Sequence, residues 1–402
     1  MRKTITIGDL GEVITGKTPL KTNKNYYGNY ALFIKPTDIS EDRKYTYETE
    51  DMYSQLAAET YKTSLIPKGS ICVPCIGTIG TKMTMSPCDC YTNQSINTIV
   101  CNERYDNEYV YYLIKNFLPS LKSYNLGTAS GREYVSKSNF EMIEIDAEQD
   151  LTKQKRIGAI LSRYDTLIEN YQKQIKLLEE AAQRLYKEWF VDLRFPGYEK
   201  VKVVDGVPEG WERKRAIDFF TISIGKTPPR AEKQWFTDGT DGIPWVSISD
   251  MKDVSFVIST SEGLTKEACE KHNIKIVSKG SVLLSFKLTV GRVAIANTDL
   301  CTNEAIAHFI KDGENWREYT FLCLRNYNYD SLGNTSGISK AVNSTIVKNM
   351  PFLMPTDIVL DKFSSKLVPM FNTIKNLQSQ IRNLKESRDR MLVKLMSGEI
   401  EV

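Results

Sequence analysis

Two long stretches of the chain carry apolar residues at alternating steps of three and four positions, over 161–189 and again over 367–395. This spacing is the heptad seam of an amphipathic helix that packs against another helix. Each seam alone would be exposed to water, so we expect the two helices to pair with each other. The residues predicted to pair are Leu161, Ile168, Ile175, Leu178 and Leu185 in the first stretch, with Leu367, Ile374, Ile381, Leu384 and Met391 in the second.

The segment before the first helix has the pattern of a mixed α/β domain. Short apolar runs rich in β-branched residues predict strands at 70–73, 95–100 and 142–145, and the spacing over 108–117 predicts a helix. Turn signals follow the first long helix, at Phe195-Pro-Gly and Pro208-Glu-Gly-Trp, and indicate a linker.

After this linker the pattern begins again, which identifies an internal repeat. The repeated motifs are Gly16-Lys-Thr-Pro with Gly225-Lys-Thr-Pro, Lys68-Gly-Ser with Lys279-Gly-Ser, Thr92-Asn-Gln with Thr302-Asn-Glu, and Gly127-Thr-Ala-Ser-Gly with Gly333-Asn-Thr-Ser-Gly. We therefore predict an α/β (α+β) protein with two similar globular domains separated by two long antiparallel coiled-coil helices. The predicted segments are 1–150 for the first domain, 151–192 for the first helix, 193–212 for the linker, 213–357 for the second domain, and 358–402 for the second helix and tail.

Antiparallel pairing of the helices would relate the two domains by a pseudo-twofold axis. The sugar-phosphate backbone of duplex DNA has the same symmetry, because its strands are antiparallel. Two domains related in this way could each read one half of a DNA site, with the helices fixing the spacing.

Composition adds further limits. A length of 402 residues suggests two to three domains. The N-terminal residues lack an apolar block of signal-peptide length, and no run of about 18 apolar residues occurs. The eight cysteines are irregularly spaced, which favours reduced thiols in the cytoplasm. The net charge is only +3, so any nucleic-acid site must be a local basic patch.

Two short motifs allow competing interpretations. The stretch from Gly11 to Thr18 fits the formula of a phosphate-binding Walker loop, but Pro19 follows directly and the second copy has Phe220 in place of Gly11. A turn near a DNA-facing surface is the preferred interpretation, and nucleotide binding that depends on Lys17 would favour an ATPase. Four cysteines, Cys72, Cys75, Cys88 and Cys90, could hold zinc, but the second copy keeps a cysteine only at the last of these positions, Cys301, and buried thiols are the preferred interpretation.

Catalytic motifs are not evident. The two histidines, His272 and His308, are far apart, and His308 lies in an apolar strand pattern typical of a core residue. We find neither a methyltransferase cofactor motif nor a nuclease carboxylate cluster, so we predict a protein that is not an enzyme.

The chain resembles the specificity subunit of Type I restriction-modification systems over essentially its whole length. The resemblance is carried by Gln154-Lys-Arg-Ile-Gly-Ala-Ile-Leu, by Leu185-Tyr-Lys-Glu-Trp-Phe-Val-Asp with the two turn motifs after it, and by the terminal Lys394-Leu-Met-Ser-Gly-Glu-Ile. It implies two target-recognition domains that read a bipartite asymmetric DNA sequence. It also implies double-stranded DNA, two methyltransferase subunits and, through them, restriction subunits as partners. S-adenosylmethionine is then expected on the methyltransferase, and ATP and Mg on the restriction subunit.

Polar residues in the loops are the candidates for DNA contacts, because Arg and Lys can donate to guanine or phosphate and Asn can pair with adenine. In the first domain they are Lys17, Thr18, Lys35, Thr78, Lys82, Tyr124, Asn125, Ser130 and Arg132. In the second they are Lys226, Thr227, Arg230, Lys287, Arg292, Asn334, Ser336, Ser339 and Lys340.

Two features depart from the family pattern. The segment 350–360 lacks a Glu-Gln-Lys-Arg-Ile motif, which blurs the start of the second helix, and Arg388 interrupts its apolar seam. We expect Arg388 to extend to water or to meet a partner subunit. The alternative function is a protein-protein scaffold, which strong salt dependence of DNA binding would exclude.

Overall fold

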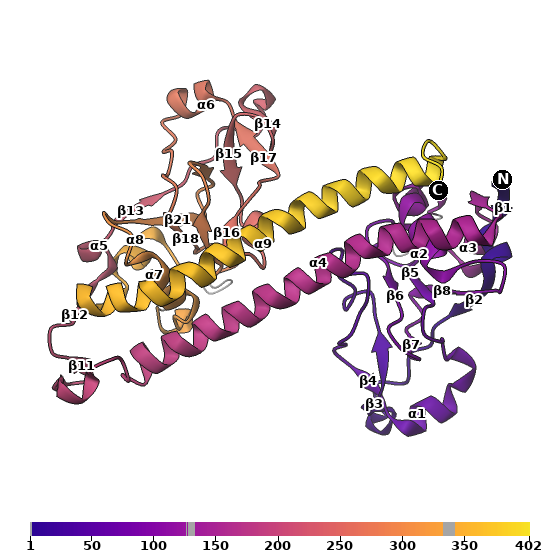
Figure 1. The fold of residues 1–402 in the computed structure, drawn as a ribbon, viewed down its shortest axis with the longest axis horizontal. Coiled ribbons are helices and arrows are strands. Elements are labelled where there is room, and N and C mark those ends of the chain that lie inside the picture. Colours follow the sequence, from indigo (N-terminus) through magenta and orange to yellow (C-terminus); the bar gives the residue numbers. More distant parts are fainter. Residues whose placement is uncertain (1, 126, 128–132, 333–341) are drawn as a thin grey trace. The chain divides into compact units, whose positions relative to one another are not determined.

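The computed structural model describes residues 2–125, 127, 133–332 and 342–402. The chain forms two compact units (Figure 1). Unit 1 comprises Met1–Asn170 and Asn383–Val402, and unit 2 comprises Tyr171–Arg382. Each unit has its own sheets and takes in part of both long helices, so the predicted domain boundaries stay a prediction.

Unit 1 is built on a four-stranded antiparallel sheet in the order β2-β8-β5-β6. Its strands are β2 (Gly11–Thr15), β5 (Ile71–Pro74), β6 (Thr84–Met85) and β8 (Ile96–Cys101). A smaller sheet contains β3 (Tyr27–Ile34), β4 (Met52–Tyr53) and β7 (Tyr91–Thr92), and β1 (Arg2–Thr6) pairs with β9 (Glu144–Glu148). The helices are α1 (Gln55–Thr60), α2 (Asn107–Phe117) and α3 (Lys137–Glu141). The strands and the helix predicted from apolar spacing are confirmed by β5, β8, β9 and α2.

Unit 2 repeats this arrangement. Its main sheet has the order β13-β21-β18-β19-β16, and a second sheet has the order β14-β17-β15-β20. The strands of the main sheet are β13 (Thr221–Ile224), β16 (Phe256–Val257), β18 (Val282–Ser285), β19 (Val293–Ala296) and β21 (Ile306–Ile310). Those of the second are β14 (Phe236–Asp238), β15 (Ile243–Val246), β17 (Glu262–Leu264) and β20 (Cys301–Thr302). The pairing of the first strand of each main sheet is also repeated. In unit 1, Ile14 of β2 lies opposite Thr98 of β8, and in unit 2, Ser223 of β13 lies opposite His308 of β21.

The remaining elements of unit 2 are shorter. Two antiparallel pairs are β10 (Val203–Val204) with β11 (Val207–Pro208), and β12 (Glu212–Arg215) with β22 (Pro351–Met354). The helices are α5 (Ala216–Phe219), α6 (Lys266–Lys271), α7 (Arg317–Arg325) and α8 (Ser344–Asn349). The second long helix begins just after β22, at Asp357, which resolves the boundary that the sequence left blurred.

The two long helices are α4 (Leu151–Tyr186), continued by a π-helical turn over Lys187–Val191, and α9 (Asp357–Ser397). In unit 1 the core combines Leu161, near the start of α4, with Leu392 and Leu395, near the end of α9. In unit 2 it combines Ala182, near the end of α4, with Leu367, near the start of α9. The helices therefore pair in antiparallel fashion within each unit.

The residues predicted to pair the helices are withdrawn from solvent to different degrees. Leu161, Ile168, Leu367 and Ile374 are at most 1% exposed. The others, Ile175, Leu178, Leu185, Ile381, Leu384 and Met391, are partly buried. Leu161 belongs to the core of unit 1, and Leu367 and Ile374 belong to the core of unit 2.

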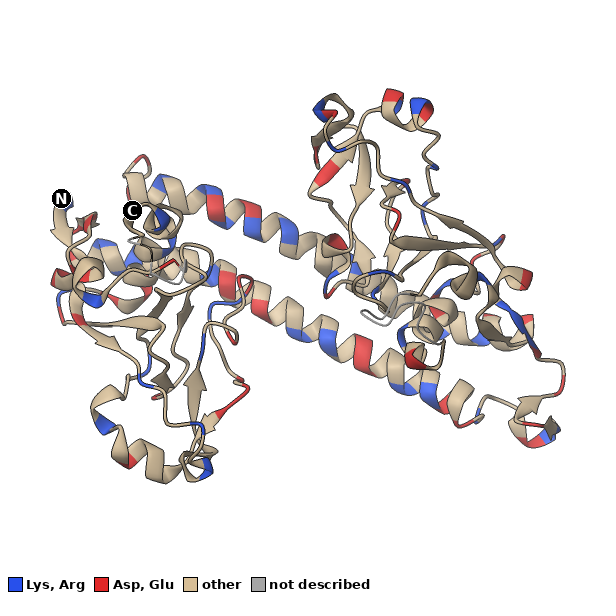
Figure 2. Ribbon diagram, turned by 180° about the vertical axis from the view of Figure 1, so that it is seen from behind, with Lys and Arg blue, Asp and Glu red and all other residues tan. Residues whose placement is uncertain are grey.

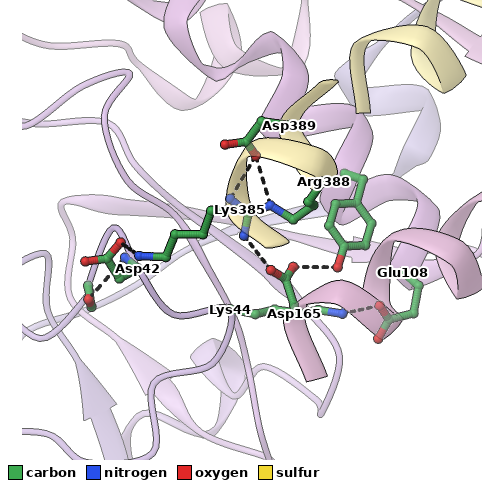
Figure 3. Close-up of polar contacts among 9 residues, drawn as sticks. Asp42, Lys44, Glu108, Asp165, Lys385, Arg388 and Asp389 are labelled. Atoms are coloured by element: carbon green, nitrogen blue, oxygen red, sulfur yellow. Dashed lines mark hydrogen bonds and ion pairs between the residues drawn. The ribbon is translucent and has the colours of Figure 1, made fainter. Parts of the chain in front are cut away.

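The expectation for Arg388 was wrong. The residue is only 8% exposed, so its side chain does not extend to water. Its guanidinium already has a partner within this chain, because it forms an ion pair with Asp165 of α4 (Figure 3). Tyr112 on α2 donates a hydrogen bond of 2.6 Å to the same carboxylate. Asp389 accepts a second hydrogen bond from Arg388, at 2.9 Å. A charged seam residue is stable here because a carboxylate on the facing helix neutralises it.

Further polar contacts surround this pair. Lys44 forms an ion pair with Glu108, and Lys385 of α9 forms one with Asp42 (Figure 3). Burial raises the pKa of Asp165, but the charges of Lys115 and Arg388 and the Tyr112 hydroxyl lower it, and the net effect is a lowered pKa. Asp165 is therefore ionised at neutral pH inside the core of unit 1.

Among the described residues, no helix combines the length and the apolar character needed to cross a membrane.

Candidate nucleic-acid interface

The Gly-Lys-Thr-Pro motif forms a turn that requires glycine in both copies. A Cβ atom built on Gly16 would lie 2.1 Å from the carbonyl oxygen of Thr92. On Gly225 it would lie 2.1 Å from the Thr302 hydroxyl and 2.2 Å from the carbonyl oxygen of Asn303. Since no side chain fits at such distances, glycine lets this turn approach the backbone of the neighbouring loop.

Hydrogen bonds then fix the lysine of the motif. The amide of Lys17 donates to the Thr92 carbonyl at 2.9 Å, and Tyr53 donates to the Lys17 carbonyl at 2.6 Å. In unit 2 the amide of Lys226 donates to the Thr302 carbonyl, also at 2.9 Å. There the indole of Trp245 replaces the tyrosine and donates to the Lys226 carbonyl at 3.3 Å.

With the backbone held on both sides, the predicted site residues of this turn differ in exposure, and the Lys226 ammonium donates to the His272 carbonyl at 2.6 Å. Lys17 and Lys226 are exposed, and Thr18 and Thr227 are half-buried. The structure therefore presents the same Lys-Thr pair on each unit from a fixed backbone.

The loop packed against this turn presents a second polar position. In unit 1, Asn93 accepts a hydrogen bond from the amide of Ser95 at 3.1 Å, and Gln94 between them is exposed. The Thr18 hydroxyl donates to the Gln94 side chain. Gln94 was not among the residues predicted to contact DNA, although the repeated Thr-Asn-Gln and Thr-Asn-Glu motifs were a signal for it.

The corresponding loop of unit 2 has the same geometry with a different side chain. Asn303 accepts from the amide of Ala305 at 3.1 Å, and Glu304 is exposed between them. Thr227 donates to the Glu304 carboxylate.

Several predicted residues of unit 2 meet around this carboxylate. Burial raises the pKa of Glu304, but the Thr227 hydrogen bond and the charges of Lys287 and Arg230 lower it, and the net pKa is lowered. The Arg230 guanidinium lies 4.5 Å from the centroid of the Trp245 ring. It also donates to both carboxylate oxygens of Glu262, at 2.8 Å each. These contacts hold the Arg230 cation in place, and its charge and that of Lys287 act on Glu304.

Other predicted residues are engaged within the protein. The Lys35 ammonium contacts Glu50 at 2.6 Å and Asp51 at 2.9 Å. The Arg292 guanidinium donates to the carbonyl of Ile248 at 2.7 Å. Both side chains therefore have a structural role here, which sequence spacing did not reveal.

The remaining predicted residues lie on other loops. Tyr124 is 39% exposed, with its ring 5.9 Å from that of Phe117. Asn125 accepts hydrogen bonds from the amides of Gly127 at 2.9 Å and Tyr134 at 2.8 Å, so its side chain closes the loop. Thr78 is exposed and Lys82 is half-buried. Six predicted residues, Ser130, Arg132, Asn334, Ser336, Ser339 and Lys340, lie outside the described residues.

The backbone argues against a Walker loop at Gly11 to Thr18. Residues Gly11–Thr15 form strand β2, and Gly11 itself pairs with Cys101 of β8. The next helical segment begins only at Lys24. A phosphate-binding loop needs free backbone amides at the start of a helix, and this segment does not provide them.

The cysteines are all free thiols. Cys88 is exposed, whereas Cys72, Cys75 and Cys90 are buried, and burial raises the pKa of Cys72 and of Cys75 to about 12. In the part of the chain that the structure describes, no group of three or more His, Cys, Asp or Glu residues could hold a metal ion.

His308 is a buried core residue, as its strand pattern predicted. One ring nitrogen lies 2.9 Å from the Ser223 hydroxyl and the other lies 2.7 Å from the Thr302 hydroxyl. Burial lowers the pKa of His308 to about 4, so the ring is neutral at physiological pH.

Charge is distributed without a single dominant field. Each long helix carries more basic than acidic residues. Basic and acidic residues are interspersed over both units (Figure 2). This agrees with the small net charge of +3 and leaves the repeated turns as local sites.

Comparison with known proteins identifies the family. The model of the Type I restriction modification DNA specificity domain matches residues 2–180 and 208–382. The MjaIX specificity subunit of a Type I restriction enzyme from Methanocaldococcus jannaschii is 28% identical, over 98% of this chain and 93% of the relative. The HindI specificity subunit from Haemophilus influenzae is 30% identical over 48% of this chain and 42% of its own length.

A solved structure shares the fold. The S subunit of a Type I restriction-modification system from M. genitalium superposes with a TM-score of 0.61 at 13% identity, covering 98% of this chain and 96% of that one. The two family matches together take in most of the chain, and each contains one Gly-Lys-Thr-Pro turn. The chain therefore belongs to the family of Type I restriction-modification specificity subunits, the DNA-recognising and non-catalytic part of these systems.

Proposed function

We propose that this chain reads a bipartite asymmetric DNA target, with one half-site recognised by each unit. The observation that carries the proposal is the duplicated turn, in which Lys17-Thr18 and Lys226-Thr227 are held by equivalent backbone bonds. A recognition surface needs side chains that are fixed before DNA arrives, because ordering them on binding weakens affinity. Different polar residues around one repeated turn would give the two units different specificities.

The long helices would set the gap between the half-sites and dock the other subunits. Their seams are apolar and paired within each unit, and charged residues, mostly basic, occur along both helices (Figure 2). Exposed charged side chains of this kind suit contacts with protein partners.

We propose two methyltransferase subunits as the direct partners and restriction subunits as partners through them. S-adenosylmethionine would then be bound by the methyltransferase, and ATP and Mg by the restriction subunit. The assembled complex would act in the cytoplasm, where its DNA substrate is found.

The test is methylome sequencing of cells that express this chain with its cognate methyltransferase subunit, compared with cells that express the methyltransferase alone. We expect a new methylated motif of two half-sites with a fixed gap. Its absence, when the complex has been purified intact from the same cells, would contradict the proposal.

A binding measurement tests the role of the turns. In the purified complex, Lys17→Ala and Lys226→Ala should each weaken DNA binding and reduce the slope of log K against log salt by about 1, because each removes one phosphate contact. Lys202→Ala is the matched control, since Lys202 is an exposed lysine in the segment between the two family matches. Equal effects of all three variants would count against the assigned turns.

A further inference from the structure

We infer that Gln94 and Glu304 are matched base-reading side chains, with Gln94 selecting adenine in one half-site and Glu304 selecting cytosine in the other. The inference rests on the proposed function and assigns specific residues to it. Neither residue was among those selected from the sequence.

The two side chains occupy one position of the repeated fold. Each follows an asparagine whose side chain accepts a hydrogen bond from the amide two residues further on, at 3.1 Å in both units. The residue that follows each of the two side chains also accepts a hydrogen bond through its backbone carbonyl. Ser95 accepts from the amide of Cys75 at 2.8 Å, and Ala305 accepts from that of Phe286 at 2.9 Å.

Each side chain is also oriented by the Gly-Lys-Thr-Pro turn. Thr18 donates to the Gln94 side chain and Thr227 donates to that of Glu304. The backbone and the threonine are therefore the same in both units, and only the final amide or carboxylate differs. Such a position can change specificity without changing the fold.

A carboxylate in this place calls for an explanation. Glu304 is exposed beside the predicted phosphate-binding lysine turn, and Lys287 and Arg230 lie close enough to lower its pKa. A carboxylate next to DNA is repelled by the phosphates, and a hydrogen bond accepted from a base, together with the charges of Lys287 and Arg230, offsets this cost. Thr227 bonds to one of its oxygens, and the capacity of a carboxylate for several donors leaves room for a base amino group.

The chemistry of the two groups determines the expected bases. A carboxylate only accepts, and in the major groove cytosine presents its N4 amino donor. The glutamine amide both donates and accepts, which matches N7 and the N6 amino group of adenine. A correct contact of this kind discriminates against a wrong base on the order of 10- to 100-fold.

The experiment exchanges the two side chains in the full chain, expressed with its cognate methyltransferase subunit. Glu304→Gln should change one base of one half-site from cytosine toward adenine and leave the other half-site unchanged. Gln94→Glu should make the reverse change in the opposite half-site. Methylome sequencing shows both changes, and binding to duplexes that differ at that base should shift by 10- to 100-fold. Glu267→Gln is the matched control, because Glu267 is exposed on α6 and undergoes the same chemical change.

The outcomes separate the inference from the proposed function. A wild-type complex without a bipartite motif would overturn both. A normal wild-type motif that neither exchange alters would overturn only the inference. The same holds if Glu304→Gln strengthens binding to all duplexes equally, because the carboxylate would then act only through its charge.

Discussion

Replacing Arg388 with Met should destabilise unit 1 selectively. The substitution keeps an unbranched side chain but removes the cation, and it leaves the carboxylate of Asp165 buried with only 6% of its side chain exposed. Breaking a buried ion pair by removing one partner costs about 3–5 kcal/mol. We expect the lower end, about 3 kcal/mol, because the Tyr112 hydroxyl and the charge of Lys115 still stabilise the carboxylate.

The tryptophans provide an internal reference for this measurement. All five, Trp189, Trp211, Trp235, Trp245 and Trp316, lie in unit 2. Tryptophan fluorescence during urea unfolding therefore follows unit 2 and should change little. Hydrogen exchange of peptides from strand β8 follows the core of unit 1, where a loss of about 3 kcal/mol corresponds to a roughly 100-fold drop in protection.

Two further variants make the reasoning refutable. Arg390→Met is the control on the same helix, because its side chain is 79% exposed and it should cost less than about 0.5 kcal/mol. Adding Asp165→Leu to Arg388→Met should recover part of the lost stability, since the unpaired carboxylate is then removed while Lys115 and Tyr112 lose their contacts with it. A deficit below about 1 kcal/mol in Arg388→Met, or a double variant no more stable than the single one, would refute the argument.

The stability lost in Arg388→Met should also depend on pH. The pKa of Asp165 is lowered in the folded protein, so its stabilising contribution is present above the unfolded value of 3.8 and is lost as the pH falls through the folded value. The difference between wild type and Arg388→Met is therefore expected to be largest near neutral pH and to shrink in acid. A difference that stays constant as the pH falls below 3.8 would contradict this assignment.

Three other substitutions have defined outcomes. Gly16→Ala places a Cβ atom 2.1 Å from the Thr92 carbonyl oxygen, so the stability of unit 1 measured by hydrogen exchange should fall by at least about 2 kcal/mol. DNA binding should weaken as well. If neither changes, the turn does not approach Thr92 this closely. His308 has a folded pKa of about 4 against an ordinary value of 6.5, so the unfolded chain binds the extra proton and unit 2 should lose about 3 kcal/mol as the pH falls between these values. Urea unfolding followed by tryptophan fluorescence should show this loss in wild type and not in His308→Gln. Leu288 is 92% exposed and has a φ of 61°, a left-handed conformation that favours glycine. Leu288→Gly should therefore raise the stability of unit 2 by about 0.5 kcal/mol in the same assay. A loss of stability would show that the leucine packs favourably.

Much of the fold could be predicted because apolar spacing is a local property. The seams of α4 and α9 repeat every few residues, and the repeated glycine motifs mark one backbone used twice. The pairing of Arg388 could not be predicted in this way. Its partner Asp165 is 223 residues away in the sequence, so only the tertiary structure shows that the charges meet.

The candidate site shows the same limit. Lys17 and Lys226 were found because glycine and proline flank them in both copies. Lys35 has equally favourable neighbours in sequence, but the carboxylates that bind it come from Glu50 and Asp51 across a long loop. The sequence identifies a positively charged residue, but whether that residue can contact DNA depends on which carboxylates the fold places beside it.

The division of the long helices between the units has a consequence for synthesis of the protein. Unit 2 is one continuous segment, Tyr171–Arg382, whereas the core of unit 1 includes Leu392, Leu395 and Met396 from Asn383–Val402. On the ribosome, the first 170 residues emerge long before the residues that complete their core. Domains made first generally fold first, but here we expect the later segment to be complete earlier. Until α9 has been translated, the apolar face of the early segment stays open and is the part of the nascent chain that chaperones would bind.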